Sequence, residues 1–164
     1  MRPSRLALLT LTLLALLELA YFYPRLPDTV ATHFDAAGQA DGWSAKAAFV
    51  QTNAGIILLL ALLFPGISWL VARLPADLIN MPNREYWLSE ERRAATLSTI
   101  QQQMEWLGVA TLLLLIAILQ VSLAASLTPG ATLPAATLWL PLAGFLVFMV
   151  IWTAIFIGRF YRKT

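Results

Sequence analysis

The sequence predicts an all-α integral membrane protein, a bundle of four transmembrane helices with both termini in the cytoplasm. Composition leads to this class, because 59% of the 164 residues are hydrophobic and only 12% are charged. The mean hydropathy of +0.72 also lies well above that of a soluble domain. The polar sequence that remains is too short to form a separate soluble domain.

Four apolar stretches, at residues 6–23, 49–72, 107–127 and 135–157, predict the membrane spans. Each is close to the roughly 20 residues that a helix needs to cross about 30 Å of hydrocarbon. Helices are expected because backbone groups in lipid need internal partners and no stretch alternates as a barrel strand does. The first span resembles an export signal, but it ends in Tyr21, Phe22 and Tyr23 without a small-residue cleavage site, so we expect it to be retained.

The basic residues predict the orientation of the spans. Of the 11 Lys and Arg residues, Arg25 and Lys46 fall on one side of the predicted membrane. The others fall on the opposite side: Arg2, Arg5, Arg73, Arg84, Arg92, Arg93, Arg159, Arg162 and Lys163. The positive-inside rule then places this second side in the cytoplasm. It also explains the basic charge, so no nucleic-acid partner is expected.

The chain divides into three predicted regions. Residues 1–72 hold the first two spans and an external loop, residues 73–106 form a cytoplasmic connector, and residues 107–164 hold the last two spans with a short basic tail. A second external turn is expected at Pro129 and Gly130. The chain has no cysteine, which excludes disulfides, thiol redox chemistry and thiolate zinc sites.

The external loop carries the only histidine of the chain. Pro24 and Pro27 end the first helix, and glycines predict turns at "AAGQ" and "ADGW". A folded loop could bring an imidazole and two carboxylates around one cation, although turn caps and membrane-interface contacts explain the same residues more simply. No metal is predicted. The candidate loop-binding residues are His33, Asp35, Gly38, Asp41, Gly42, Trp43 and Lys46.

The same loop carries a family resemblance. The run from Tyr23 through "PRLP", followed by "THFDAAGQADGWSAK", resembles the signature of the bacterial membrane family called domain of unknown function 1648. This domain also forms the front half of SdpI-type toxin-immunity membrane proteins. The resemblance covers the first two spans and their loop, and it implies an immunity or signalling role rather than an enzyme. The second half of the chain departs from the SdpI-type pattern, since it lacks the additional helices and the cytoplasmic motif.

The connector has an irregular first part and a helical second part. Pro75 and Pro82 keep the first part irregular, whereas Ser89 followed by two glutamates predicts a helix start. This helix is expected to continue into the third span without a break. Tyr86 and Trp87 are expected at the lipid surface, with Arg84, Arg92 and Arg93 available to anionic headgroups. Docking of a cytosolic partner on this segment remains an alternative.

Glu18 is the ionisable residue within the predicted spans. Such residues are costly in lipid and usually face the interior of a bundle. Polar residues at comparable depth on the second and third spans predict either a functional pocket or simple bonds between helices. The candidate residues of this intramembrane polar pocket are Glu18, Gln51, Asn53 and Gln120.

No catalytic motif is present, so a non-enzymatic function without a cofactor is expected. The favoured hypothesis is a membrane protein in the lipid bilayer that senses or binds an envelope ligand or a toxin peptide. The alternative is an accessory or structural subunit of a transport or envelope complex. A metal-dependent envelope enzyme at His33, Asp35 and Asp41 is the least favoured, because the chain has no further histidine. The oligomeric state is left open.

Overall fold

Four long helices and one β-hairpin make up the chain in a computed structural model that describes residues 1–128 and 134–162. The helices are α1 (Pro3–Phe22), α2 (Lys46–Val71), α4 (Arg93–Leu127) and α5 (Ala136–Tyr161). Shorter elements are β1 (Thr29–Phe34), β2 (Ala40–Ala45), α3 (Arg84–Trp87) and the 3-10 turns η1 (Tyr23–Arg25) and η2 (Ala76–Leu78). The predictions for Pro129, Gly130 and Lys163 concern residues outside the described ones.

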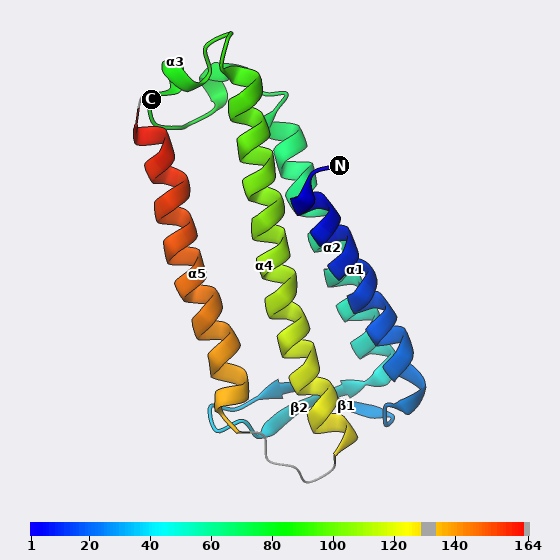
Figure 1. Cartoon of the computed structure of the whole chain (residues 1–164). Helices are drawn as coiled ribbons and strands as arrows, with labels where there is room; N and C mark the ends of the chain where they lie inside the picture. Colours follow the sequence, from blue (N-terminus) through cyan, green and yellow to red (C-terminus); the bar gives the residue numbers. More distant parts are fainter. Residues whose placement is uncertain (129–133, 163–164) are drawn as a thin grey trace.

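The prediction of four membrane-spanning helices is confirmed, since all four long helices are long and apolar enough to cross a bilayer. They alternate in direction, so both described ends of the chain lie opposite the hairpin (Figure 1). We call the end with β1 and β2 the hairpin end, and the end with residues 72–92 the connector end. At about 1.5 Å per residue, the 35 residues of α4 extend well beyond a hydrocarbon layer of about 30 Å.

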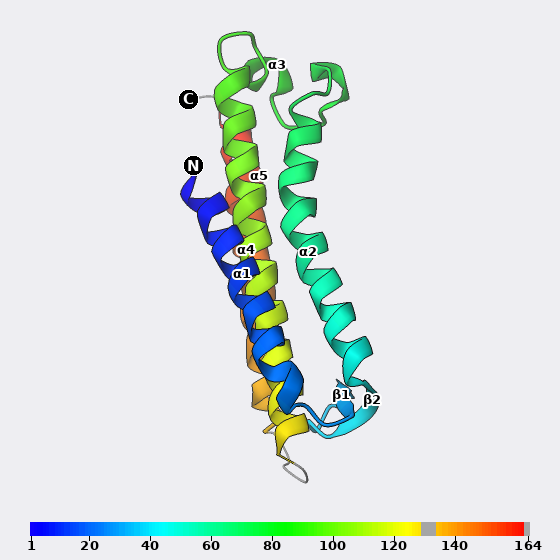
Figure 2. The same ribbon diagram turned by 90° about the vertical axis from the view of Figure 1, so that its right-hand side faces the viewer.

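Helix α4 is the centre of the bundle. It packs against α1, α2 and α5, whereas α5 packs chiefly on α4. Figure 2 shows α1, α4 and α5 nearly in one layer, with α2 lying to one side. In the most apolar stretch of α4, 39% of the residues are buried. In the most apolar stretch of α5, no residue is buried. The core therefore lies between α1, α2 and α4, and it includes Leu8, Leu19, Ile57, Leu112 and Leu119.

Gly108 allows the closest packing in this core. A Cβ atom at this position would lie 2.8 Å from the ring of Phe64 on α2 and 3.2 Å from Leu8 on α1. Both distances are too short for an ordinary contact, so a side chain here would push the helices apart. Small residues in membrane helices commonly serve this purpose.

The hairpin was not predicted from the sequence, which indicated only an ordered loop. Strands β1 and β2 pair antiparallel from Thr29 opposite Ala45 to Phe34 opposite Ala40. The turn expected at "AAGQ" is present, with Gly38 at a φ of 85° that favours glycine. The turn expected at "ADGW" is wrong, because these residues lie within β2. A hairpin this short alternates too few residues to be recognised from its pattern.

Candidate functional site

The hairpin is held against the end of the bundle through strand β1. Val30 and Ala31 are fully buried, and the Ala31 N–H donates a hydrogen bond of 3.0 Å to Oγ of Ser126 on α4. At the exit from β2, the Lys46 N–H donates to the carbonyl of Asp28, and Lys46 Nζ lies 3.3 Å from Oδ1 of the same residue. The predicted loop residue Lys46 thus anchors the start of α2.

His33 and Asp41 form a hydrogen-bonded pair on the exposed side of the hairpin. His33 pairs with Gly42, and a bulge lies on each side of this pair. Thr32 is the extra residue of β1 in the first bulge, and Asp41 is the extra residue of β2 in the second. A Cβ at position 42 would lie 2.7 Å from Cβ of His33, so this crossing requires glycine. Since bulges re-aim side chains, they account for the approach of a histidine and an aspartate that lie eight residues apart.

Asp35 does not join this pair. Its Oδ1 accepts hydrogen bonds of 2.9 Å from the N–H groups of Ala37 and Gln39, and it therefore closes the turn of the hairpin. The cation cluster of one imidazole and two carboxylates is not assembled. Within the described residues, no group of three or more His, Cys, Asp or Glu side chains is placed to hold a metal ion.

The outer edge of β2 pairs with no further strand within the described residues. Trp43 lies opposite Ala31, whose N–H bonds to Ser126 instead of to β2. In an antiparallel ladder this identifies a pair without mutual hydrogen bonds, so the N–H and C=O of Trp43 point away from β1. The side chain of Trp43 is 56% exposed, and in the described chain β2 has β1 as its one strand neighbour. This edge is available to a further strand.

Glu18 and Gln120 are brought together, but the other two residues of the predicted polar pocket are not. Gln120 donates a hydrogen bond from Nε2 to Oε1 of Glu18. Asn53 donates to the carbonyl of Phe49 in its own helix, and Gln51 is exposed on α2. Glu18 lies at the edge of the contact between α1 and α4 instead of in the core. It is partly exposed on the outer surface, because the core side of α1 is filled by Leu8, Ala15 and Leu19.

Glu105 is the acidic residue that the sequence analysis missed. It lies in α4 near the connector end, is 0% exposed, and accepts bonds from Oγ of Ser4 at 2.6 Å and Nε of Arg5 at 3.1 Å. Arg5 Nη2 lies 2.9 Å from its carboxylate, and Arg2 Nη1 lies 3.9 Å away. Since Glu105 precedes the third apolar stretch, its position in the sequence resembled that of an ordinary connector residue. The signal that was available is the two arginines beside Ser4 at the facing end of α1.

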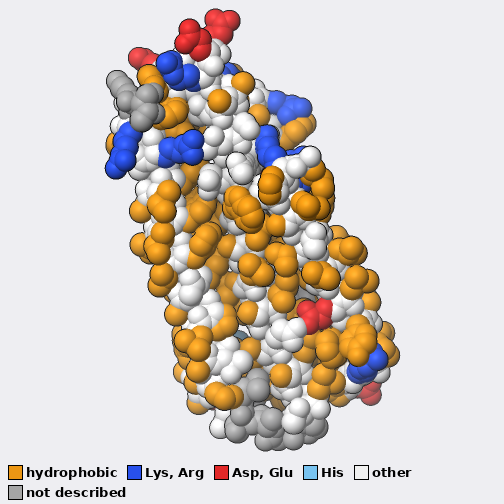
Figure 3. Space-filling model, viewed as in Figure 1, with side chains coloured by type: hydrophobic (Ala, Val, Ile, Leu, Met, Phe, Trp, Pro, Cys, Tyr) orange, Lys and Arg blue, Asp and Glu red, His pale blue; other side chains and the backbone are white. Residues whose placement is uncertain are grey.

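The connector closes over the end of α5. Asn83 Nδ2 donates to the carbonyls of Phe160 and Tyr161, and Trp87 Nε1 donates to that of Phe160. These bonds satisfy carbonyl groups that lack partners at a helix end. As expected, one uninterrupted helix leads from the connector into the third span, although it starts at Arg93 instead of Ser89. Figure 3 shows most of the basic side chains on this face at the connector end.

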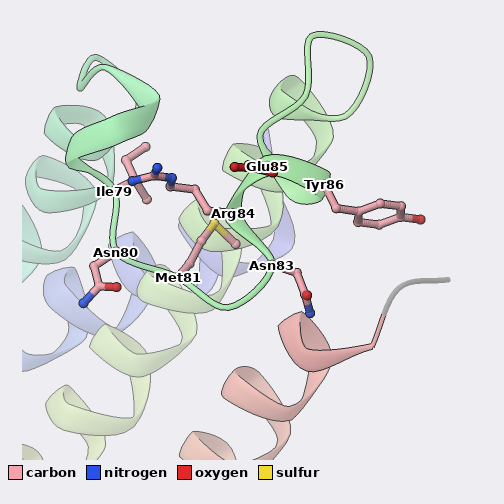
Figure 4. A pocket seen from close by; sticks show the side chains of 7 residues that line it. All are labelled: Ile79, Asn80, Met81, Asn83, Arg84, Glu85 and Tyr86. Atoms are coloured by element: carbon pink, nitrogen blue, oxygen red, sulfur yellow. The ribbon is translucent and has the colours of Figure 1, made fainter.

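The arginines predicted to face headgroups also have partners within the connector. Arg84 donates to the carbonyl of Asp77, Arg93 donates to that of Leu74, and Arg92 lies over the ring of Tyr86. A hollow of about 380 Å³ lies beside Arg84, with Asn83 reaching from it to the end of α5 (Figure 4). Of its polar side chains, Arg84 bonds within the connector and Asn83 bonds to the end of α5.

A family comparison bears on the hairpin end. Residues 10–53 match the model of a family described as domain of unknown function DUF1648. The DUF1648 match spans most of α1, the hairpin and the start of α2, which is less than half of the chain. The resemblance to this domain is thereby confirmed, whereas the relation to SdpI-type immunity proteins stays a prediction. No curated protein and no solved structure matches the chain.

Proposed function

We propose that this chain is a non-enzymatic multi-pass protein of a bacterial inner membrane whose hairpin recognises an extended peptide in the envelope. The observation that carries the proposal is the outward-facing edge of β2 at Trp43. An extended peptide can add to such an edge as a further strand, with main-chain bonds for affinity and side-chain contacts for selectivity. Trp43 offers a large aromatic contact, and the pair of His33 with Asp41 offers polar ones.

The distribution of charge supports an external hairpin. Nine of the 11 Lys and Arg residues belong to the termini and the connector, and two belong to the hairpin end. This bias favours a cytoplasmic connector and leaves the hairpin accessible from outside. A peptide toxin or a peptide signal in the envelope would meet β2 there. The DUF1648 match includes the hairpin, and the SdpI-type relation, which stays a prediction from the sequence, would agree with this role.

Two variants of Trp43 test the proposal in a bacterium whose own copy of the gene is deleted. Trp43→Pro removes the outward N–H without removing a bond of the hairpin ladder, and Trp43→Ala removes the aromatic contact. Trp69→Ala, which alters an exposed tryptophan at the other end of α2, is the control. We expect survival under secreted peptide toxins to fall with deletion and with both Trp43 variants, at equal protein levels. Unchanged survival in the deletion strain and in both variants would contradict the proposal.

An accessory role in a larger complex is a second candidate, and the exposure of α5 favours it. An apolar groove of about 610 Å³ runs between α4 and α5, beside Trp106, Pro141, Phe148 and Trp152. A helix of a partner subunit would bury such a surface. Purification in mild detergent from native membranes distinguishes the two roles: a stoichiometric partner bound along α5 supports the accessory role, and its absence supports the peptide-binding role.

A further inference from the structure

Glu18 lies on a membrane-facing surface formed by two helices. We define the Glu18 face as Leu14, Leu17, Glu18 and Tyr21 of α1 together with Leu113 and Gln120 of α4. The four large apolar members are between 51% and 58% exposed, and a hollow of about 500 Å³ lies beside Glu18. Figure 3 shows an acidic group among apolar side chains over α1 and α4.

The polar atoms of this face are incompletely paired by the described part of the chain. One N–H of Gln120 bonds to Oε1 of Glu18. A carboxyl group and a carboxamide have several further donor and acceptor positions, and hydrocarbon can satisfy none of them. Ionisable side chains in membrane helices are therefore almost always covered by protein or water. The Glu18 face therefore carries polar groups that are normally covered by protein or water, although it is exposed in the single chain.

We propose that a second copy of this chain covers the Glu18 face and forms a two-fold symmetric dimer. Two copies inserted in the same direction are related by an axis normal to the membrane, which brings residues of equal depth together. Glu18 and Gln120 are in contact within one chain, so they lie at equal depth and meet their counterparts across such an axis.

The chemistry of the pair is self-complementary. The second N–H and the carbonyl oxygen of Gln120 match the acceptor and the O–H of a neutral Glu18 in the other copy. Leu14, Leu17 and Tyr21 then pack around this polar centre and exclude lipid from it. Since an unrelated helix would need its own polar group at the same depth, the second copy is the occupant that this chain already specifies.

Crosslinking in native membranes tests the dimer, because the chain has no cysteine of its own. A thiol introduced by Leu17→Cys lies on the Glu18 face, whereas Val150→Cys places one on the exposed side of α5. With a short bifunctional maleimide, we expect a band of twice the mass of the chain from Leu17→Cys, at least ten times stronger than from Val150→Cys. Equal bands, a monomer alone, or an adduct with a different protein would overturn the proposal.

Variants of the polar pair show whether it holds the dimer together. In the Leu17→Cys chain, we expect Glu18→Leu to reduce the crosslinked fraction at least fivefold, and Glu18→Gln to retain it because an amide can make the same bonds. Gln120→Leu provides a second test should the first variant accumulate poorly. Retention of the full crosslinked fraction in both leucine variants would overturn the proposal. The assay needs no peptide ligand, so its outcome is independent of the function proposed above.

Discussion

The two acidic residues within the long helices differ sharply in their surroundings. Glu105 of α4 lies at the connector end, fully buried and bonded to Ser4 and Arg5 of α1. Glu18 of α1 lies near the hairpin end, partly exposed and bonded to Gln120 of α4. The same two parallel helices are thus joined through an acidic side chain near each end, Glu105 of α4 at one and Glu18 of α1 at the other. The difference teaches that the connector end is closed within one chain, whereas the hairpin end leaves polar and aromatic groups available for other molecules.

The largest expected effect on stability is at the connector end. Glu105→Ala leaves Arg5 and the buried hydroxyl of Ser4 without their carboxylate partner, and breaking a buried ion pair typically costs about 3–5 kcal/mol of unfolding free energy. Since Arg5 retains some contact with water, we expect the lower half of this range. The measurement is the unfolding free energy in detergent micelles.

Two matched variants sharpen this result. Glu91→Ala alters a carboxylate that is 84% exposed and paired with Arg92, so its effect should stay within about 0.5 kcal/mol. The double variant Arg5→Met with Glu105→Leu should recover most of the lost stability, because it replaces both charges together. Equal stability of Glu105→Ala and Glu91→Ala would contradict the difference between the buried and exposed acids.

The next effect concerns the packing of α4 in the core. Gly108→Ala introduces a Cβ 2.8 Å from the ring of Phe64, and such overpacking typically costs about 1–3 kcal/mol. Gly144→Ala on α5 is the control, since its Cβ has no atom within 4 Å. At that position, the higher helix propensity of alanine should increase the unfolding free energy by as much as about 1 kcal/mol. In detergent, the unfolding temperature should therefore fall for Gly108→Ala and rise for Gly144→Ala. A change in the same direction for both variants would show that α4 and α5 pack alike.

A smaller effect on stability is expected at the hairpin end. Asp35→Ala removes the oxygen that accepts hydrogen bonds from two backbone N–H groups in the hairpin turn. Each bond contributes at most about 0.5–1.5 kcal/mol to stability, because water can take the place of the carboxylate. Amide exchange should quicken in residues 29–45 and stay unchanged in α4. Asp28→Ala, at a side chain that is 98% exposed, is the control and should leave both regions unchanged. Faster exchange in α4 would mean that the two ends are not independent.

The smallest effect belongs to Glu18 in the separated chain. In dilute detergent, Glu18→Leu removes one bond between helices, and such bonds are worth about 0.6 kcal/mol on average. We expect a change in unfolding free energy of this size, several times smaller than that of Glu105→Ala. A loss as large as that of Glu105→Ala would place both acids in the same structural role.

The spans could be predicted from the sequence because lipid imposes a simple requirement of length and apolarity. The contact of Glu18 with Gln120 could also be anticipated, since few polar residues share that depth. Other features depend on contacts between distant segments. Glu105 is buried because the start of α1 lies against α4, and Gly42 lies in a bulged strand instead of a turn because it pairs with His33 of β1. Residue spacing alone does not encode such contacts.

Labelling of two introduced thiols in intact cells tests the different roles of the two ends most directly. Ala37→Cys lies in the exposed turn of the hairpin, and Glu85→Cys lies in the exposed part of the connector. With a maleimide that does not cross membranes, we expect Ala37→Cys to be labelled in intact cells and Glu85→Cys only after the cells are opened. Labelling of Glu85→Cys in intact cells, with Ala37→Cys protected, would contradict an external hairpin and the function proposed for it.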